Sequence, residues 1–439
     1  MRTKNKNNRI SSSDAEASFS LIVARIVYGI NWFNISAIFP LIALEFEKDV
    51  SLLGSMSAAF FIGVGLFQIP AGIFAARFNP RTSAIVGIII TSSAALLCGL
   101  VISSSQLIWL RFIVGFGMAF FFSSAVILIT KYGKRGFPGF SIGIMNSAHS
   151  MGGIIGIFAW IAIAQMIGWR PSLILSGVLG LGTALFMIMT IPKSKLIVDG
   201  DSTVDHKRYQ PTRKGQEFHI FTTLSVLSNR TLVCLGLILI GIQAAWAVEL
   251  TFLVVYLGSL GFSGQFVGII ASLPLIFAII SAPLIGRFYD KAKDTKRVLI
   301  ICGIGTSMAI AGLSIDNLFV IITSVILTGF FSGGAFTVVY EKARTVLINS
   351  AVDHRRTATS PDLETDRRNL GERKHRFLSD SSYFDTLKVA WVNGLSLIGV
   401  LWTPLAFSYI VEEVSYDLAW IISAAITAVF AITPIKLLK

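Results

Sequence analysis

A small number of ionisable side chains lie inside long apolar stretches of this 439-residue chain. They are Arg25, Arg111, His149, Glu249 and Glu341. Because a charge within hydrocarbon is costly, each of them is a candidate for function. Arg111 and Glu249 carry opposite charges, and a rearrangement that separates such a pair changes the proton affinity of the carboxylate. This gives a route to proton coupling. The alternatives are a static Arg111–Glu249 pair and an Arg111 side chain that binds backbone carbonyl groups.

The other embedded charges have different settings. Arg25 lies roughly two turns from the end of its stretch, so its long side chain can reach the membrane surface, and we expect a gating or structural role. Glu341 is flanked by Lys342 and Arg344 near the end of another stretch, which indicates a local charge network. His149 is the second candidate for proton coupling.

Uncharged polar side chains accompany these charges. They are Tyr28, Asn31, Asn34, Gln243, Trp246 and Asn393. The spacing of three between Gln243, Trp246 and Glu249 predicts that they share one face of a helix. The sequence therefore predicts a site for substrate binding and proton coupling. Its members are Arg111, Glu249, Gln243, Trp246, Asn31, Asn34 and His149.

No pattern in the sequence indicates catalysis, a metal or a cofactor. The three cysteines, Cys98, Cys234 and Cys302, lie in apolar stretches and are too few for a disulfide framework or a metal site. The apolar stretches hold no cluster of acids and no His/Cys constellation, which argues against an enzyme. The paired glycines lack a Walker-type loop, so ATP hydrolysis is not expected.

Twelve apolar stretches must position these polar groups. They lie at residues 18–43, 51–76, 82–102, 106–130, 139–166, 169–191, 231–258, 264–286, 297–315, 318–340, 388–410 and 415–435. Each is as long as the roughly 17–20 residues with which a helix crosses the ~30 Å hydrocarbon core. Only a continuous helix satisfies the backbone there. The sequence therefore predicts an all-α membrane protein with 12 transmembrane helices.

The charge distribution predicts an orientation. The chain is 54% hydrophobic and 14% charged, with a formal net charge of +13. Basic residues concentrate in the N-terminal tail and in every second connection, and the alternate connections are mainly acidic. By the positive-inside rule both termini are cytoplasmic. The basic balance is therefore a topology signal and not a nucleic-acid footprint.

The two halves of the chain repeat each other. Asn146-Ser-Ala-His-Ser-Met-Gly152 parallels Asn393-Gly-Leu-Ser-Leu-Ile-Gly399, and Gly115-Phe-Gly117 parallels Gly329-Phe-Phe-Ser-Gly333. This repeat predicts two six-helix bundles with a substrate site between them. The predicted divisions are a cytoplasmic tail at 1–17, an N-terminal bundle at 18–191, a cytoplasmic linker at 192–230, and a C-terminal bundle at 231–439 that includes a polar cytoplasmic loop at 347–385.

Several segments resemble the major facilitator superfamily of secondary transporters. Leu107-x-x-x-Arg111-x-x-x-Gly115-x-Gly117-x-Ala119 is similar to the family's membrane-embedded arginine motif. Segments 72–81 and 286–291 resemble its signature loop, G-x-x-x-D-R-x-G-R, although Ala76 and Asn79 depart from it. In the family this loop latches the bundles together on the cytoplasmic side. The predicted gating residues are Arg25, Gly72, Arg77, Arg81, Gly286, Asp290, Lys291 and Glu341.

The resemblance implies a monomeric secondary transporter of the plasma membrane that moves a small solute by alternating access and needs no cofactor. The family's antiporter motif is only partly present, because Ala148-His149 replaces its Gly-Pro pair. This departure favours antiport less but does not exclude it, and symport, antiport and facilitated diffusion stay open. An interior with more basic than acidic side chains favours a small organic anion. Efflux of drugs or other solutes by the same fold remains an alternative, as does a non-transporting membrane receptor or scaffold.

Overall fold

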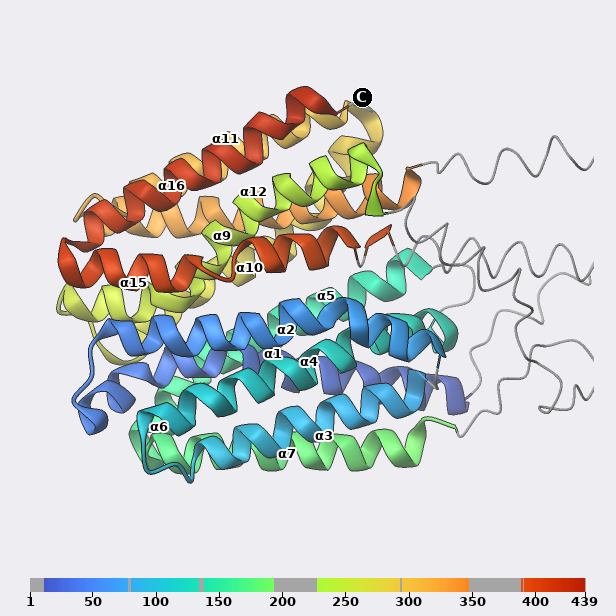
Figure 1. Ribbon diagram of the computed structural model, residues 1–439, viewed down its shortest axis with the longest axis horizontal. Helices are drawn as coiled ribbons and strands as arrows, with labels where there is room; N and C mark the ends of the chain where they lie inside the picture. Colours follow the sequence, from blue (N-terminus) through green and yellow to red (C-terminus); the bar gives the residue numbers. More distant parts are fainter. Residues whose placement is uncertain are drawn as a thin grey trace, which may run out of the picture.

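The computed structural model describes residues 12–77, 80–133, 138–192, 227–292, 294–346, 388–389 and 391–438. These residues form long helices that lie side by side (Figure 1). Within them, 12 helices are long and apolar enough to cross a membrane. The predicted all-α class with 12 transmembrane helices is therefore confirmed.

The helices form two bundles, drawn in Figure 1 in blue to green and in yellow-green to red. The N-terminal bundle contains α1 (Ser12–Phe46), α2 (Val50–Arg77), α3 (Pro80–Cys98), α4 (Ser104–Tyr132), α5 (Pro138–Ile154), the π-helical turn η1 (Ile155–Ala159), α6 (Trp160–Ile167) and α7 (Trp169–Thr190). The C-terminal bundle contains α9 (Arg230–Ser259), α10 (Gly264–Ala292), α11 (Thr295–Gly312), α12 (Leu318–Thr345), α15 (Thr403–Glu413), α16 (Tyr416–Ile432) and the 3₁₀ turn η2 (Thr433–Leu437).

The eleventh span differs from the continuous helix predicted at 388–410. Residues 391–399 are helical, 400–402 form a turn, and α15 follows. Pro404 has no N–H group to donate to the carbonyl of Val400, so the regular helical bond is missing there. Instead the N–H of Thr403 donates to Val400 O at 3.1 Å, which closes a tighter turn.

Glycines bring α1 and α5 into direct contact. A Cβ atom at Gly29 would collide with the carbonyl oxygen of His149, and one at Gly152 would collide with the carbonyl oxygen of Ile26. Only glycine allows two helix backbones to approach so closely. This approach fixes His149 against α1.

The two bundles are joined most firmly at the end of the molecule where α1 meets α2. One apolar cluster there contains Phe39 and Leu53 from the N-terminal bundle together with Phe252, Leu257 and Phe407 from the C-terminal bundle. Toward the other end, the apolar cluster of α9, α11 and α12 is built from the C-terminal bundle alone. Burial of apolar side chains therefore closes one end of the interface between the bundles.

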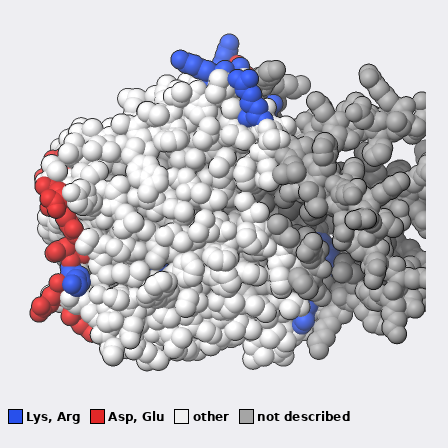
Figure 2. Space-filling model, in the orientation of Figure 1, with Lys and Arg blue, Asp and Glu red and all other residues white. Residues whose placement is uncertain are grey.

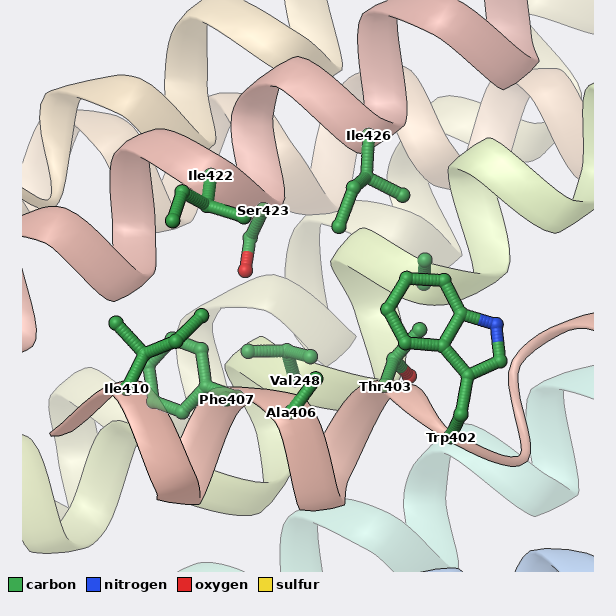
Figure 3. A pocket seen from close by; sticks show the side chains of 10 residues that line it. Val248, Trp402, Thr403, Ala406, Phe407, Ile410, Ile422, Ser423 and Ile426 are labelled. Carbon is green, nitrogen blue, oxygen red and sulfur yellow. The ribbon is translucent and has the colours of Figure 1, made fainter. Parts of the chain in front are cut away.

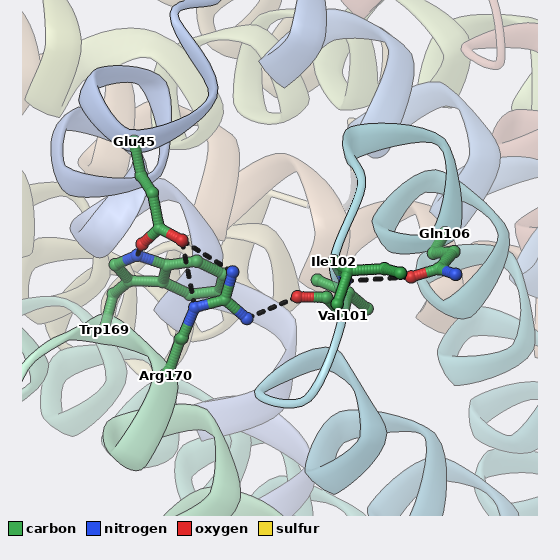
Figure 4. A network of polar contacts seen from close by, with 6 residues as sticks. All are labelled: Glu45, Val101, Ile102, Gln106, Trp169 and Arg170. Atoms are coloured by element: carbon green, nitrogen blue, oxygen red, sulfur yellow. Dashed lines mark hydrogen bonds and ion pairs between the residues drawn. The ribbon is translucent and has the colours of Figure 1, made fainter.

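Charged side chains gather at the two ends of the helices. Acidic side chains mark the end closed by the apolar cluster, and the surface between the ends shows almost no charge (Figure 2). At the acidic end, Glu45 of α1 accepts hydrogen bonds from Trp169 Nε1 at 2.6 Å and from Arg170 Nη2 at 2.6 Å, and Arg170 also donates to the carbonyl of Val101 (Figure 4). This network ties α1 and α7 to the α3–α4 connection.

Candidate functional site

Arg25 of α1 is a buried cation with unused hydrogen-bond donors. Its side chain is 5% exposed and lies between two aromatic rings, with Cζ at 4.3 Å from the centroid of Tyr28 and 4.8 Å from that of Phe122. Within the described part of the chain, neither its Nε nor its Nη1 has a hydrogen-bond partner. The rings stabilise the charge without using those donors. A carboxylate or sulfonate is the partner that suits them, because charge-assisted bonds to guanidinium are strong.

His149 of α5 lies beside this arginine. Its ring centroid is 5.6 Å from those of Tyr28 and Trp32 and 5.5 Å from that of Phe33, all on α1. The imidazole interacts electrostatically with Arg25, and its Nδ1 is buried without a partner among the described residues. We call Arg25, Tyr28, Trp32 and His149 the Arg25–His149 site. It combines a fixed cation, a titratable imidazole and aromatic surface.

The C-terminal bundle faces this site with α12. Tyr340 interacts electrostatically with Arg25, and its hydroxyl donates to Asn393 Oδ1 at 2.7 Å. Phe336 lies one turn before it, with ring centroids 6.1 Å from Tyr340 and 6.3 Å from Trp246 of α9. The Arg25–His149 site therefore lies where the two bundles face each other, opposite a row of aromatic side chains.

Arg111 of α4 has a different role from Arg25. Its Nη1 donates to the carbonyl oxygen of Asn31 at 3.1 Å, and its Cζ lies 4.7 Å from the ring centroid of Phe60. The side chain is 4% exposed and connects α4 to α1 within the N-terminal bundle. Among the described residues no ion pair joins it to Glu249. Of the possibilities raised by the sequence, the structure has Arg111 bound to a backbone carbonyl group.

Glu249 points away from the Arg25–His149 site. It lies two residues, about 200° around α9, from Ala247, which packs in the apolar cluster of the N-terminal bundle. Gln243 and Glu249 are six residues and hence about 120° apart, so Gln243, Trp246 and Glu249 are spread over about a third of the circumference of α9. Glu249 is 0% exposed, and in the described structure neither carboxyl oxygen has a hydrogen-bond partner.

The two asparagines of α1 also lie away from Arg25. Asn34 is nine residues from Arg25, which places it on the opposite side of the helix. It is 1% exposed, and Asn31, also 1% exposed, donates from Nδ2 to Val27 O at 3.1 Å. Both belong to the interior of the N-terminal bundle.

The residues of the site that sequence reasoning missed are Phe122, Phe336 and Tyr340. Phe336 and Tyr340 lie on one face of span ten, just before Glu341, and this aromatic pair was the signal available in the sequence.

The structure describes only part of the predicted cytoplasmic latch. Arg81 donates from Nε to Ile191 O at 2.7 Å and from Nη2 to Ile188 O at 2.8 Å, which ties α3 to the end of α7. Gly72 lies in α2, Gly286 in α10, and half-buried Glu341 in α12. The side chains of Arg77, Asp290 and Lys291 are outside the described set, so the latch remains a prediction.

A separate cavity of about 160 Å³ lies between α9, α15 and α16 (Figure 3). Val248, Phe407 and Ile426 contribute apolar surface to it. The hydroxyls of Thr403 and Ser423 also line it, but each donates to a carbonyl of its own chain segment, at 2.9 and 2.8 Å. The cavity offers no charge to an anion, so it does not compete with the Arg25–His149 site.

Comparison with known proteins agrees with the motif resemblance. The model of the Major Facilitator Superfamily matches residues 21–352. The probable sulfoacetate transporter SauU of Cupriavidus necator is 34% identical over 152 residues, 35% of each chain. The 4-hydroxybenzoate transporter PcaK of Pseudomonas putida is 23% identical over 222 residues, 51% of this chain and 47% of the relative. The matched regions thus span less than half of the length of each of these two relatives.

The crystal structure of the nucleoside transporter NupG shares the fold of this chain. The TM-score is 0.68 at 13% sequence identity, and the match covers 98% of this chain and 99% of that one.

Proposed function

Because this chain belongs to the major facilitator superfamily, we propose that it carries a small organic anion across the membrane by alternating access. The observation that supports this most is Arg25, a buried guanidinium at the interface between the bundles with two donors that no described residue uses. The family consists of transporters and not of enzymes. We also propose cytoplasmic termini, as the charge pattern of the sequence suggests, and a monomeric protein of the plasma membrane, as the family resemblance implies.

The names of the relatives support an acidic substrate. Sulfoacetate carries a sulfonate and a carboxylate, and 4-hydroxybenzoate is an aromatic carboxylate. Both chemistries present oxygens that can accept from Nε and Nη1 of Arg25. The rings of Trp32 and Phe336, half-buried on opposite sides of the site, would contact the organic part of such a molecule.

His149 is the group that we propose for proton coupling. An anion bound beside Arg25 would offset the positive charge that faces the imidazole, so anion binding and protonation of His149 would favour each other. A proton and an anion would then move together as a symport. Glu249, which the sequence placed first for this role, points into the C-terminal bundle and does not face the anion.

A binding screen tests this proposal. Thermal unfolding of the purified protein in detergent should be shifted upward by 4-hydroxybenzoate, sulfoacetate or a related acid, and not by sugars or amphiphilic cations. A ligand at 100 times its Kd stabilises a protein by about 2.7 kcal/mol. Arg25→Gln should lose the shift, and Arg297→Gln should keep it, because that side chain is 84% exposed at the start of α11. Equal shifts in the parent and Arg25→Gln would refute the proposed site.

A further inference from the structure

Three oxygen-bearing side chains are buried inside the C-terminal bundle, away from the Arg25–His149 site. They are Glu249 of α9, Thr306 of α11 and Ser332 of α12, each 0% exposed. Both carboxyl oxygens and both hydroxyls have no hydrogen-bond partner within the described residues. We propose that these three side chains, here called the C-terminal polar layer, form a binding site for Na⁺.

Helix register brings Glu249 and Thr306 to the same level. The hydroxyl of Tyr256 donates to the carbonyl of Leu313 at 2.7 Å, which fixes α9 against α11. These two helices are separated in the chain by α10 alone and run in the same direction. Glu249 lies seven residues before Tyr256, and Thr306 lies seven residues before Leu313. Seven residues are about two turns of helix, so Glu249 and Thr306 face each other two turns before the contact between Tyr256 and Leu313.

The neighbours of Thr306 show where its side chain points. Gly305 packs against the ring of Phe331 on α12, and the hydroxyl of Ser307 donates to Ala424 O of α16 at 2.8 Å. Thr306, between them, is directed between α12 and α16, where α9 packs against both helices.

Ser332 is directed to the same region. Phe331 on one side of it contacts α11 at Gly305, and Gly333 on the other side packs against α10 at Ala278. The serine hydroxyl therefore points between α11 and α10, again toward α9. All three oxygen-bearing groups converge on one level of the bundle.

Apolar clusters enclose this level on both sides. Leu253, Ile310 and Val325 belong to the apolar cluster on one side. The cluster on the other side contains Ile242, Cys302 and Val339. A carboxylate in such a setting needs a counter-charge, because its transfer from water is costly. The described Lys and Arg side chains of this bundle, such as Arg230 and Lys342, lie at helix ends.

The donor set suits a small monovalent cation. Carboxylate and hydroxyl oxygens are hard ligands. One monovalent ion neutralises the single carboxylate, whereas a divalent ion would leave a net charge in apolar surroundings. Oxygen ligands of one ion point at the ion and do not hydrogen-bond to each other. The oxygens of the C-terminal polar layer likewise make no hydrogen bond to each other or to other described residues.

The internal repeat marks the difference between the bundles. The number of residues that separates Gly115 from Gly329 in the repeated glycine motifs also separates Ser92 of α3 from Thr306. The Ser92 hydroxyl is likewise buried without a hydrogen-bond partner in the described structure. That bundle contains its own buried cation, Arg111. The C-terminal bundle has a buried acid instead, for which a bound ion supplies the positive charge.

Sodium titration of the purified full-length protein tests the site. Unfolding temperature is measured in detergent with NaCl, KCl or choline chloride at constant ionic strength and pH, without any organic anion. Na⁺ should raise the unfolding temperature saturably above the choline value, and K⁺ should do so less. Because no organic anion is present, failure here leaves the Arg25 proposal untouched, and failure of anion binding leaves this site untouched.

Matched variants separate a bound ion from a general salt effect. Thr306→Val keeps the branched shape and removes one ligand, so the Na⁺ concentration for half-maximal shift should rise at least tenfold; Ser332→Ala is the second such variant. Thr427→Val is the control, because that equally buried hydroxyl already donates to Ser423 O at 2.8 Å. It should respond as the parent does. The absence of a sodium-specific shift in the parent, or an unchanged response in both ligand variants, would overturn the site.

Discussion

Replacing Arg25 by lysine should weaken anion binding without disrupting the fold. Lysine keeps the positive charge and can keep the contacts with the rings of Tyr28 and Phe122, which lie 4.3 and 4.8 Å from the guanidinium carbon. It loses the planar fork of donors, because an ammonium is a point charge. Nε and Nη1 are the atoms that no described residue uses, so their geometry is what an anion would lose.

The expected magnitude follows from the number of bonds lost. A hydrogen bond to a charged group contributes about 1.5–3 kcal/mol. If lysine preserves one of the two bonds, the loss of the other corresponds to a rise in Kd of about 10- to 150-fold, since 1.4 kcal/mol is a factor of ten. Calorimetric titration with the tightest-binding acid of the screen measures this change.

Arg111→Lys is the matched control. Arg111 already uses Nη1 on the carbonyl of Asn31, so lysine there should lower the unfolding temperature while the folded variant retains its anion affinity. The reasoning fails if Arg25→Lys binds as tightly as the parent. It also fails if Arg111→Lys loses more affinity than Arg25→Lys.

The remaining predictions concern packing, topology and coupling. Gly152→Ala should cost about 1–3 kcal/mol of stability, because the new methyl meets a carbonyl of α1. Gly182→Ala, with nothing within 4 Å, should raise stability by up to about 1 kcal/mol, because alanine is the better helix former. Equal losses in the two variants would contradict the close contact of α1 and α5. Cysteine introduced at Ser104 should react with an impermeant reagent from outside, and cysteine at Ser202 only from the cytoplasm; the reverse result would invert the topology. His149→Gln should abolish proton-driven accumulation but retain counterflow exchange, and accumulation at the parent level would place the coupling group elsewhere.

Apolar length was sufficient to predict the helices, but not their irregularities. Twelve stretches long enough to span hydrocarbon can satisfy their backbones only as helices, so their number follows from the physics of the solvent. The turn at 400–402 depends on one residue, Pro404, which lacks the N–H group that a continuous helix requires. That signal was present in the sequence and was outweighed by the length of the apolar stretch.

The partners of the buried charges were harder to predict. The cost of burying a charge identified Arg111 correctly as an interior residue, but its acceptor is the backbone carbonyl of Asn31, and a backbone carbonyl has no signature in the sequence. For Glu249, counting in steps of three accumulates an error of about 60° per step, so its carboxyl group lies about 120° around the helix from Gln243. The approach of Tyr340 to Arg25 joins opposite halves of the chain, and only the packing of the bundles determines it.

Uptake by reconstituted liposomes is the most direct test of anion transport through the Arg25–His149 site. Liposomes containing the purified parent protein, with an inwardly directed proton gradient, should accumulate a radiolabelled acid that binds in the screen, such as 4-hydroxybenzoate or sulfoacetate. Arg25→Gln liposomes should accumulate none above protein-free liposomes, and collapse of the gradient should abolish accumulation by the parent. Binding without any uptake by the parent, or uptake that is unchanged in Arg25→Gln, would contradict the account.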